Sequence, residues 1–354
     1  MHVLVVDDSA TVRQSFSMLL AKNFTVDTAA DPIIAARKIA KTRPDVVVLD
    51  LQMPRMDGLS FLKQIMRRDP LPVVICSSAA ARGSDTAMRA LEEGAVDVIL
   101  KPAAGVRDFI AEQSVMIVDT LRAASQARLV RTSAARPVVP LPPENVGRAS
   151  ARPGGLKPAL RRIVAIGAST GGTEALRVII ERLPPNAPPV VVVQHMPEGF
   201  TAAFAKRLDA LSAVEVKEAA DGDVLRAGRV LIAPGSQHLL VRRIGGEYFA
   251  SLNSGPLVSR HRPSVDVLFR SMASSAAANG IGIILTGMGD DGADGLAEMR
   301  NAGAMTIAQD EATSVIFGMP KEAIARGAVQ SVLPLPHIAP ALVSCAGLKQ
   351  GVLQ

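Results

Sequence analysis

A serine stands where a buried strand is expected to turn sharply into a helix. Ser169 lies in the stretch Gly167–Gly171, directly after the apolar run Ile163–Ile166 and before helical spacing from Glu174 to Arg182. Glycines permit a sharp turn, which pushes the serine hydroxyl out of the sheet toward a substrate. Such a corner also aims backbone N–H groups at one point, where acyl transfer needs donors for an oxyanion. These residues indicate a nucleophilic hydrolase site.

A serine nucleophile needs a base and a group that orients the base. The chain has five histidines, and His195 directly follows the expected strand Val190–Gln194, so it would stand at the same sheet edge as Ser169. A helix cap and a packed loop residue are the alternative interpretations of this histidine.

An acidic, glycine-rich stretch, Thr286–Gly292, follows the expected strand Gly282–Leu285 and offers Asp290 and Asp291. Either carboxylate could orient the base, and the alternatives are a helix N-cap or a cation loop. The spacing fits neither the EF-hand pattern nor a P-loop, because no Gly-Lys-Ser/Thr follows. The order serine, histidine, aspartate differs from that of α/β-hydrolases, so a different fold is expected.

The first half of the chain carries acids at two expected strand ends. Asp7 and Asp8 follow the strand Val3–Val6, and Asp50 follows Val46–Leu49. In a doubly wound sheet, ligands collect outside the carboxyl ends of the strands. Three carboxylates that meet there repel one another unless a cation lies among them, and oxygen ligands favour Mg²⁺. The pattern predicts a magnesium site.

Ser77 and Lys101 end the next two expected strands and supply a hydroxyl donor and a cation. The set suits a phosphoryl transfer in which Asp50 is the nucleophile, while the metal and Lys101 offset the charge of the phosphoryl oxygens. Taken alone, Asp7 and Asp8 could be solvated loop residues, and Lys101 could be an ordinary surface lysine. Four successive strand ends with these groups favour the phosphorylation pocket.

Residues 1–124 resemble the receiver domain of two-component response regulators. The resemblance rests on Asp7-Asp8, Leu49–Pro54, Met56–Gly58, Ser77 and Lys101-Pro102. It implies that a histidine kinase phosphorylates Asp50, and that Asp7, Asp8, Asp50 and the backbone carbonyl of Gln52 bind Mg²⁺. Many receivers carry Tyr or Phe three residues before the lysine, where this chain has Val98, so the phosphorylation signal must travel by another route.

Strands and helices alternate in both halves, which predicts parallel sheets with helices on both faces. We expect an α/β protein with two doubly wound domains, a flavodoxin-like domain at 1–124 and a three-layer αβα domain with a mostly parallel sheet at 159–354. Between them, 125–158 is expected to be an extended linker, because it contains Arg136–Pro143 and Pro153–Gly155.

The charge of the chain is concentrated near this linker. The net charge is +6, and 128–162 contains eight basic residues and one acidic residue. The segment holds no aromatic residue on which bases could stack, which argues against nucleic-acid binding.

The 354 residues are 48% hydrophobic and 20% charged, as expected for a folded two-domain protein. No apolar run reaches the roughly 18 residues that span a bilayer, and the N-terminus does not resemble a secretory signal. Cys76 and Cys345 lie far apart and are expected to be reduced thiols. We therefore expect a cytoplasmic protein without membrane insertion.

Nearly the whole chain except the linker resembles the chemotaxis protein-glutamate methylesterases, the CheB family. The stretches that carry the resemblance are 167–172, 194–197, 233–235 with His238, 262–266, 286–292 and 317–320. The resemblance implies a catalytic triad of Ser169 as nucleophile, His195 as general base and Asp291 as the orienting acid, with Asp290 as second choice. It further assigns the oxyanion hole to the backbone N–H groups of Thr170 and Met288.

The family's reaction is hydrolysis of glutamate γ-methyl esters on methyl-accepting chemoreceptors, which releases methanol, and deamidation of specific receptor glutamines to glutamate. The resemblance implies these activities here, with a chemotaxis histidine kinase as phosphodonor and no cofactor in the catalytic domain. It also implies that the unphosphorylated receiver covers the catalytic cleft and that phosphorylation of Asp50 opens it.

Three rival classes remain at this point: a receiver with a DNA-binding output, a hydrolase for another ester or amide, and a docking module with an inactive serine. Arg260-His-Arg262 is either a contact for an acidic receptor surface or a solvated loop.

Overall fold

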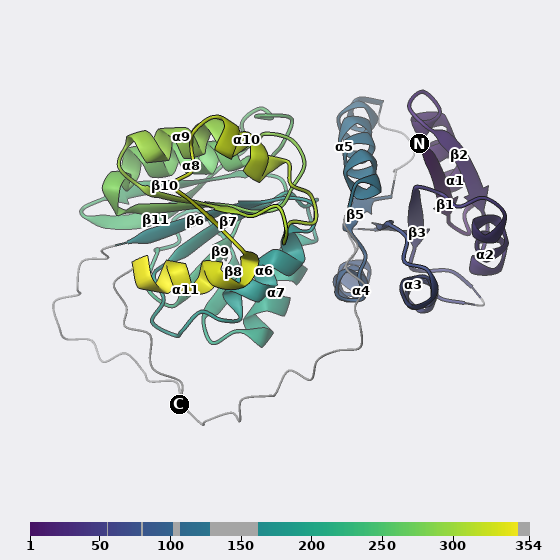
Figure 1. Cartoon of the computed structure of the whole chain (residues 1–354), viewed down its shortest axis with the longest axis horizontal. Helices are drawn as coiled ribbons and strands as arrows, with labels where there is room; N and C mark the ends of the chain where they lie inside the picture. Colours follow the sequence, from purple (N-terminus) through teal and green to yellow (C-terminus); the bar gives the residue numbers. More distant parts are fainter. Residues whose placement is uncertain (55, 79–80, 102–106, 128–161, 346–354) are drawn as a thin grey trace.

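The computed structural model describes residues 1–54, 56–78, 81–101, 107–127 and 162–345, which form two α/β domains (Figure 1). The predicted linker, 125–158, and Pro102 fall almost entirely outside these ranges. Among the described helices, none combines the length and the apolar character needed to cross a bilayer.

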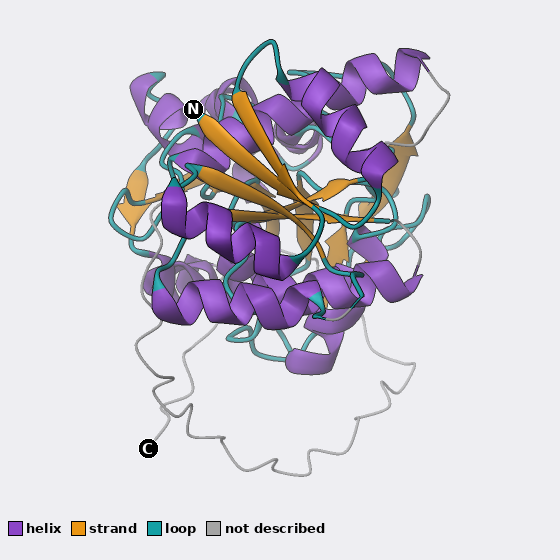
Figure 2. Cartoon of the chain, turned by 90° about the vertical axis from the view of Figure 1, so that its right-hand side faces the viewer, coloured by secondary structure: helices purple, strands orange, loops and turns teal. Residues whose placement is uncertain are grey.

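The N-terminal domain has a five-stranded sheet in the order β2-β1-β3-β4-β5, and every strand pair is parallel. Helices lie on both sides of these strands (Figure 2). The predicted doubly wound, flavodoxin-like fold is confirmed. The strands are β1 (His2–Val6), β2 (Thr25–Ala29), β3 (Val46–Asp50), β4 (Val73–Ser77) and β5 (Asp97–Leu100). The helices are α1 (Ala10–Leu20), α2 (Pro32–Lys41), α3 (Gly58–Arg68), α4 (Ala81–Glu92) and α5 (Arg107–Ser125).

The C-terminal domain is built on a seven-stranded parallel sheet in the order β14-β13-β12-β6-β7-β9-β8. Its strands are β6 (Ile163–Ala168), β7 (Val190–Gln194), β8 (Glu215–Glu218), β9 (Arg229–Ile232), β12 (Gly280–Ile284), β13 (Met305–Gln309) and β14 (Ser331–Leu333). A separate hairpin of β10 (His238–Ile244) and β11 (Glu247–Asn253) turns at Gly245-Gly246, as predicted.

Two layers of helices enclose this sheet, which confirms the predicted three-layer αβα architecture. One layer consists of α8 (Val265–Ser275), α9 (Ala293–Asn301) and α10 (Met319–Ala325), and the other of α6 (Gly172–Ile180), α7 (Thr201–Leu211) and α11 (Leu335–Cys345) (Figure 1). A short 3₁₀ turn, Ala277–Asn279, precedes β12.

The central strands β6, β7 and β12 are buried along their whole length, as expected for parallel strands covered on both faces. Gly167 in β6 permits a close approach of α8, because a Cβ there would lie 2.1 Å from Cγ1 of Val265. The first turn of α8 is thereby brought down onto the carboxyl end of the sheet.

The two domains contact each other through α4, α5 and β5 of the N-terminal domain (Figure 1). Met88 and Leu91 of α4 pack with Phe204 and Leu208 of α7. The Ser84 hydroxyl donates to the carbonyl of Gly199 (2.9 Å). Strand β5 is the edge strand of its sheet. One side pairs with β4, and the strand faces the C-terminal domain across a shared cavity.

Candidate active site

Ser169 directly follows β6 and precedes α6, at the corner that the sequence predicts. Its neighbour Gly171 adopts a left-handed conformation (φ 77°), which ordinary side chains adopt only with strain. The amide of Ser169 donates to the carbonyl of Thr286 (3.0 Å), and its carbonyl accepts from Nε2 of Gln194 (2.9 Å). The corner is therefore tied to both neighbouring strands, and only 9% of Ser169 is exposed.

His195 follows β7 and lies at the same sheet edge as Ser169. Its amide donates to the carbonyl of Ala168 (3.0 Å), and its Nε2 lies 2.8 Å from Oδ2 of Asp291. Its Nδ1 is buried and has no hydrogen-bond partner among the described residues. With the proton on Nε2 facing the carboxylate, Nδ1 is the nitrogen available to accept a proton.

Asp291 is buried. It lies just before α9 in sequence, and its carboxylate contacts the N-terminus of α8. The hydroxyl of Ser264 (2.7 Å) and the amide of Asp266 (3.1 Å) donate to its Oδ1, and the amide of Val265 (2.7 Å) donates to its Oδ2. Burial acts to raise the pKa of Asp291, but its hydrogen bonds and the nearby charges, those of His195 foremost, together hold the pKa below its usual value. This carboxylate stays ionised beside the imidazole.

Asp290 lies elsewhere, although it is adjacent in sequence. Its Oδ2 pairs with Arg326 (2.7 Å), and its side chain is 53% exposed. The structure thus brings Asp291, and not Asp290, to the histidine.

The backbone amides of Thr170 and Met288 border the same cavity as Ser169. Within the described ranges neither amide donates a hydrogen bond to another residue. The Thr286 hydroxyl accepts the amide of Ile316 (2.9 Å) and donates to the carbonyl of Thr170 (3.0 Å). These contacts hold the serine corner and the loop after β12 together, and leave both predicted oxyanion donors available.

The loop after β12 approaches Ser169 through Gly287. A Cβ at this position would lie 2.7 Å from Cβ of Ser169 and 2.3 Å from Sδ of Met319, so a side chain does not fit. Only glycine at position 287 allows this loop, and with it Met288, to lie so close to Ser169.

The cavity over these groups has a volume of about 260 Å³, and both domains form its walls. The N-terminal domain contributes β5 and the middle of α5. The residues on the catalytic side include Ser169, Thr170, His195, His261 and Met288. In this structure, the N-terminal domain covers the site.

One carboxyl group of the N-terminal domain reaches the serine corner directly. Oδ2 of Asp97 accepts a hydrogen bond from the hydroxyl of Thr170 (2.9 Å). Burial raises the pKa of Asp97 to about 6, while its hydrogen bonds and the charge of His195 oppose that rise. Val98, which replaces the aromatic residue of many receivers, is buried and borders the same cavity.

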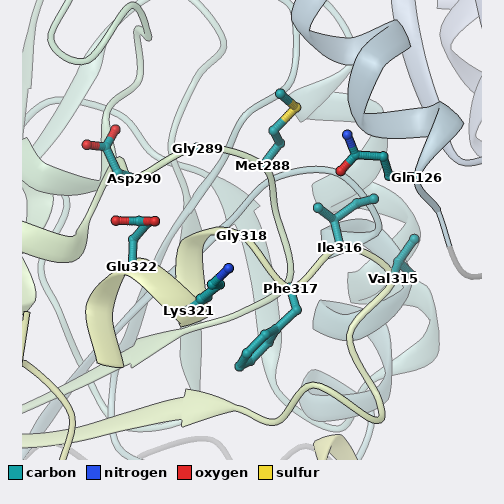
Figure 3. A pocket seen from close by; sticks show the side chains of 10 residues that line it. All are labelled: Gln126, Met288, Gly289, Asp290, Val315, Ile316, Phe317, Gly318, Lys321 and Glu322. Atoms are coloured by element: carbon teal, nitrogen blue, oxygen red, sulfur yellow. The ribbon is translucent and has the colours of Figure 1, made fainter. Parts of the chain in front are cut away.

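A second, more open hollow of about 640 Å³ adjoins the site at Met288 and Gly289. In Figure 3, Asp290 and Glu322 lie on one side of it, Gln126 lies on the other, and Lys321 lies between them. It lacks the serine and the histidine, so the smaller cavity is the candidate active site.

His261 belongs to the Arg260-His-Arg262 stretch, and no catalytic role was predicted for it, yet its ring stacks on that of His195. Arg260 and Arg262, predicted as either a receptor contact or a solvated loop, are engaged in this structure. Arg260 pairs with Asp119 of α5 (3.0 Å), and Arg262 donates to the carbonyl of Gly255 (2.8 Å). The loop is therefore not simply solvated.

In the N-terminal domain, Asp7, Asp8 and Asp50 gather at the β1/β3 edge, and one oxygen from each lies within 4.8 Å of the others. This set of hard oxygen donors fits Mg²⁺. The amide of Gln52 donates to Oδ1 of Asp50 (3.1 Å), and Ser77 is buried nearby at the end of β4. That the carbonyl of Gln52 binds the metal stays a prediction.

Lys101 connects the two buried acids, since its Nζ lies 3.1 Å from Asp7 and 2.7 Å from Asp50. Burial raises the pKa of Asp50, and the hydrogen bond from Lys101 offsets part of that rise. Burial also acts against the charge of Lys101, but the two carboxylates outweigh it and raise its pKa above the usual value. The lysine therefore stays a cation.

Comparisons with known proteins match the two halves of the chain to two different families. Residues 164–342 match the family model of the CheB methylesterase, and residues 3–111 match that of the response regulator receiver domain. The chain belongs to the CheB methylesterase family. The methylesterase match at the C-terminal domain also removes a DNA-binding output from the rival hypotheses.

Relatives in this family match over almost the full length. A protein-glutamate methylesterase/protein-glutamine glutaminase of Anaeromyxobacter dehalogenans is 57% identical over 98% of this chain and 99% of its own. A similarly named protein of Rhodospirillum rubrum is 55% identical over 96% of each chain. The crystal structure of the Thermotoga maritima CheB methylesterase catalytic domain covers 52% of this chain and 98% of its own, at 44% identity and a TM-score of 0.51.

Replacing Ser264 tests the support of Asp291. Ser264→Ala removes one donor to Asp291 and the N-cap of α8, so we expect a loss of about 1–2 kcal/mol in unfolding free energy and roughly tenfold lower kcat. Ser271→Ala is the matched control, because Ser271 accepts from Val241 and does not touch Asp291. It should lose stability without losing kcat; equal activity losses in both variants would contradict this role of Ser264.

Proposed function

We propose that the protein is a phosphorylation-activated chemotaxis methylesterase and glutaminase. It hydrolyses glutamate γ-methyl esters on methyl-accepting chemoreceptors and deamidates specific receptor glutamines in the cytoplasm. The observation that carries the proposal is the Ser169 corner beside the buried His195–Asp291 pair, in a cavity that a receiver domain covers. The names of the full-length relatives support the substrate class.

In the first step, Oγ of Ser169 attacks the γ-carbonyl carbon of the substrate while Nδ1 of His195 takes the hydroxyl proton. The carbonyl oxygen becomes an oxyanion, which the amides of Thr170 and Met288 stabilise. His195 then returns the proton to the leaving group, which departs as methanol from an ester or as ammonia from an amide. The glutamyl group stays on Ser169 as an ester.

In the second step, a water molecule attacks this ester and gives its proton to His195. The proton passes to Oγ of Ser169 as the acyl bond breaks, and the product is a receptor glutamate. Asp291 stays ionised throughout and stabilises the imidazolium that forms twice in each cycle.

Regulation acts through the N-terminal domain. A chemotaxis histidine kinase supplies the phosphoryl group to Asp50, and Lys101 holds it by charge. Asp7, Asp8, Asp50 and the carbonyl of Gln52 would hold Mg²⁺, which when bound offsets charge on the phosphoryl oxygens. Ser77 would donate a hydrogen bond to those oxygens. Strand β5 joins this pocket to the catalytic cleft, because Lys101 follows it and Asp97 begins it.

Methanol release from methylated receptor membranes tests the proposal. With acetyl phosphate and Mg²⁺ we expect at least tenfold faster release, because the receiver leaves the cleft. Asp50→Asn should abolish this stimulation, and Ser169→Ala should remove activity in both conditions. Methanol release by the Ser169→Ala variant at the wild-type rate would refute the assignment of the nucleophile.

The neighbouring acids give a matched pair of variants. Asp291→Asn removes the carboxylate that orients His195, so kcat should fall by about 10³- to 10⁴-fold. Asp290→Asn should stay close to wild type, because it changes only an exposed pair with Arg326. The methanol-release assay measures both variants. A large loss of kcat in Asp290→Asn, with Asp291→Asn close to wild type, would exclude Asp291 as the orienting acid.

Asp97 should make closure of the cleft depend on pH. Its pKa of about 6 in the closed state exceeds the ordinary 3.8, so the closed state takes up a proton more readily than the open state. Its contribution to closure is full below about pH 3.8 and is lost as pH rises through about 6. The ratio of unphosphorylated to phosphorylated activity, which cancels the pH dependence of catalysis, should therefore rise between pH 5 and 7.

Asp97→Asn should flatten this rise and lower the ratio at pH 7 by roughly tenfold, because it removes the buried charge. Asp119→Asn is the control, since it removes an exposed interdomain pair with Arg260 and should keep the trend. An unchanged pH trend in Asp97→Asn would show that another group governs it.

A further inference from the structure

The ring of His195 has a second neighbour, and the mechanism above does not use it. The ring of His261 lies parallel to it, with centroids 3.7 Å apart and planes 12° apart. The edge of the His195 ring contacts Asp291 through Nε2, so His261 covers a face that carries no hydrogen bond. The contact can therefore act on the orientation of the ring without competing for either nitrogen.

A strained turn places His261 in this position. Val258 and His261 exchange both backbone hydrogen bonds (3.1 and 2.9 Å), as in a two-residue hairpin. The two residues between them, Ser259 and Arg260, have φ of 50° and 67°. Both values lie in the left-handed region, which such turns normally fill with Asn and Gly. Strain of this kind persists where the surrounding structure requires a specific placement.

His261 is neutral in this environment. Burial, reinforced by the neighbouring His195 and Arg260, holds the pKa of His261 well below its usual value, against the opposing charge of Asp291. The charge of His195 also acts on Asp97 of the N-terminal domain, whose pKa it lowers against the effect of burial. A neutral ring can lie against the imidazolium that forms during catalysis, whereas a charged ring would repel it.

We propose that His261 is a positioning residue for the general base. Its ring, stacked on His195, holds the imidazole in the plane that keeps Nε2 on Asp291 and leaves Nδ1 unpartnered and able to accept a proton. Rotation of His195 about its Cβ–Cγ bond would break the alignment with Asp291, and the stacked ring opposes that rotation. His261 neither gains nor loses a proton and does not touch the reacting carbonyl.

This proposal rests on the proposed function of Ser169 and His195, so the experiment separates the two. Full-length wild type and Ser169→Ala are first compared in the methanol-release assay with acetyl phosphate and Mg²⁺. Equal release by these two proteins would refute the proposed function, whatever His261 does. The His261 variants are then measured in the same assay, and also by a method that needs no substrate.

Two substitutions distinguish the stacked ring from its nitrogens. His261→Phe keeps a flat ring without nitrogens, and His261→Asn keeps a polar nitrogen without a ring. We expect His261→Asn to lower kcat roughly tenfold with KM within about twofold, and His261→Phe to retain most of kcat. The acid limb of the kcat–pH profile should move in His261→Asn more than in His261→Phe. His337→Ala, an exposed histidine in α11, is the control and should match wild type.

An Asn variant as active as the Phe variant, or a loss confined to KM, would overturn the proposal. Thermal melting identifies any variant that fails to fold. Phe and Asn are used instead of Ala because both fill part of the space of the histidine side chain, so the two variants can be compared with each other.

NMR of ¹⁵N-histidine-labelled protein reads the His195 ring directly, since the chain has five histidines. We expect one tautomer, protonated at Nε2, in wild type and in His261→Phe, and a mixture of tautomers in His261→Asn. Identical His195 spectra in all three proteins would show that the stack does not position the base.

Discussion

The hydrogen bond between His195 and Asp291 is the interaction on which the rest of the catalytic domain depends. A buried carboxylate is costly unless donors surround it, and here the first turn of α8 supplies them together with the imidazole. That turn reaches the sheet edge because Gly167 leaves room for Val265. The close packing of a helix on a glycine therefore decides where the base points. The strands β6, β7 and β12 each contribute one part of the site, so none of them can shift alone.

Strand β5 links regulation to this site more directly than the sequence comparison implies. It is four residues long, and its two ends are held by different parts of the molecule. Lys101 follows it and pairs with Asp50, while Asp97 begins it and bonds to Thr170 at the serine corner. We propose that the strand itself carries the signal from Asp50 to the cleft, since its two ends contact both places.

Much of this arrangement could be predicted, because buried parallel strands appear as apolar runs and their ends are marked by polar residues. Ser169, His195 and the phosphorylation pocket all follow such runs. The edge strands β8 and β14 were not predicted, since β8 is charged at three of its four positions and β14 is only three residues long. The position of His261 has no sequence signal, because its turn lacks the usual Asn or Gly. The contact between Asp97 and Thr170 has no sequence signal either, since it depends on how two folded domains dock.

The apolar contact between the two domains has a thermal consequence. Met88 and Leu91 pack with Phe204 and Leu208, so closing the cleft removes hydrocarbon surface from water. Burial of this kind is driven largely by entropy near room temperature and weakens on cooling. We therefore expect the closed arrangement of the two domains to be held less strongly by this contact in the cold than in the warmth. The apolar part of the interface would then restrain the enzyme most where the uncovered site works fastest.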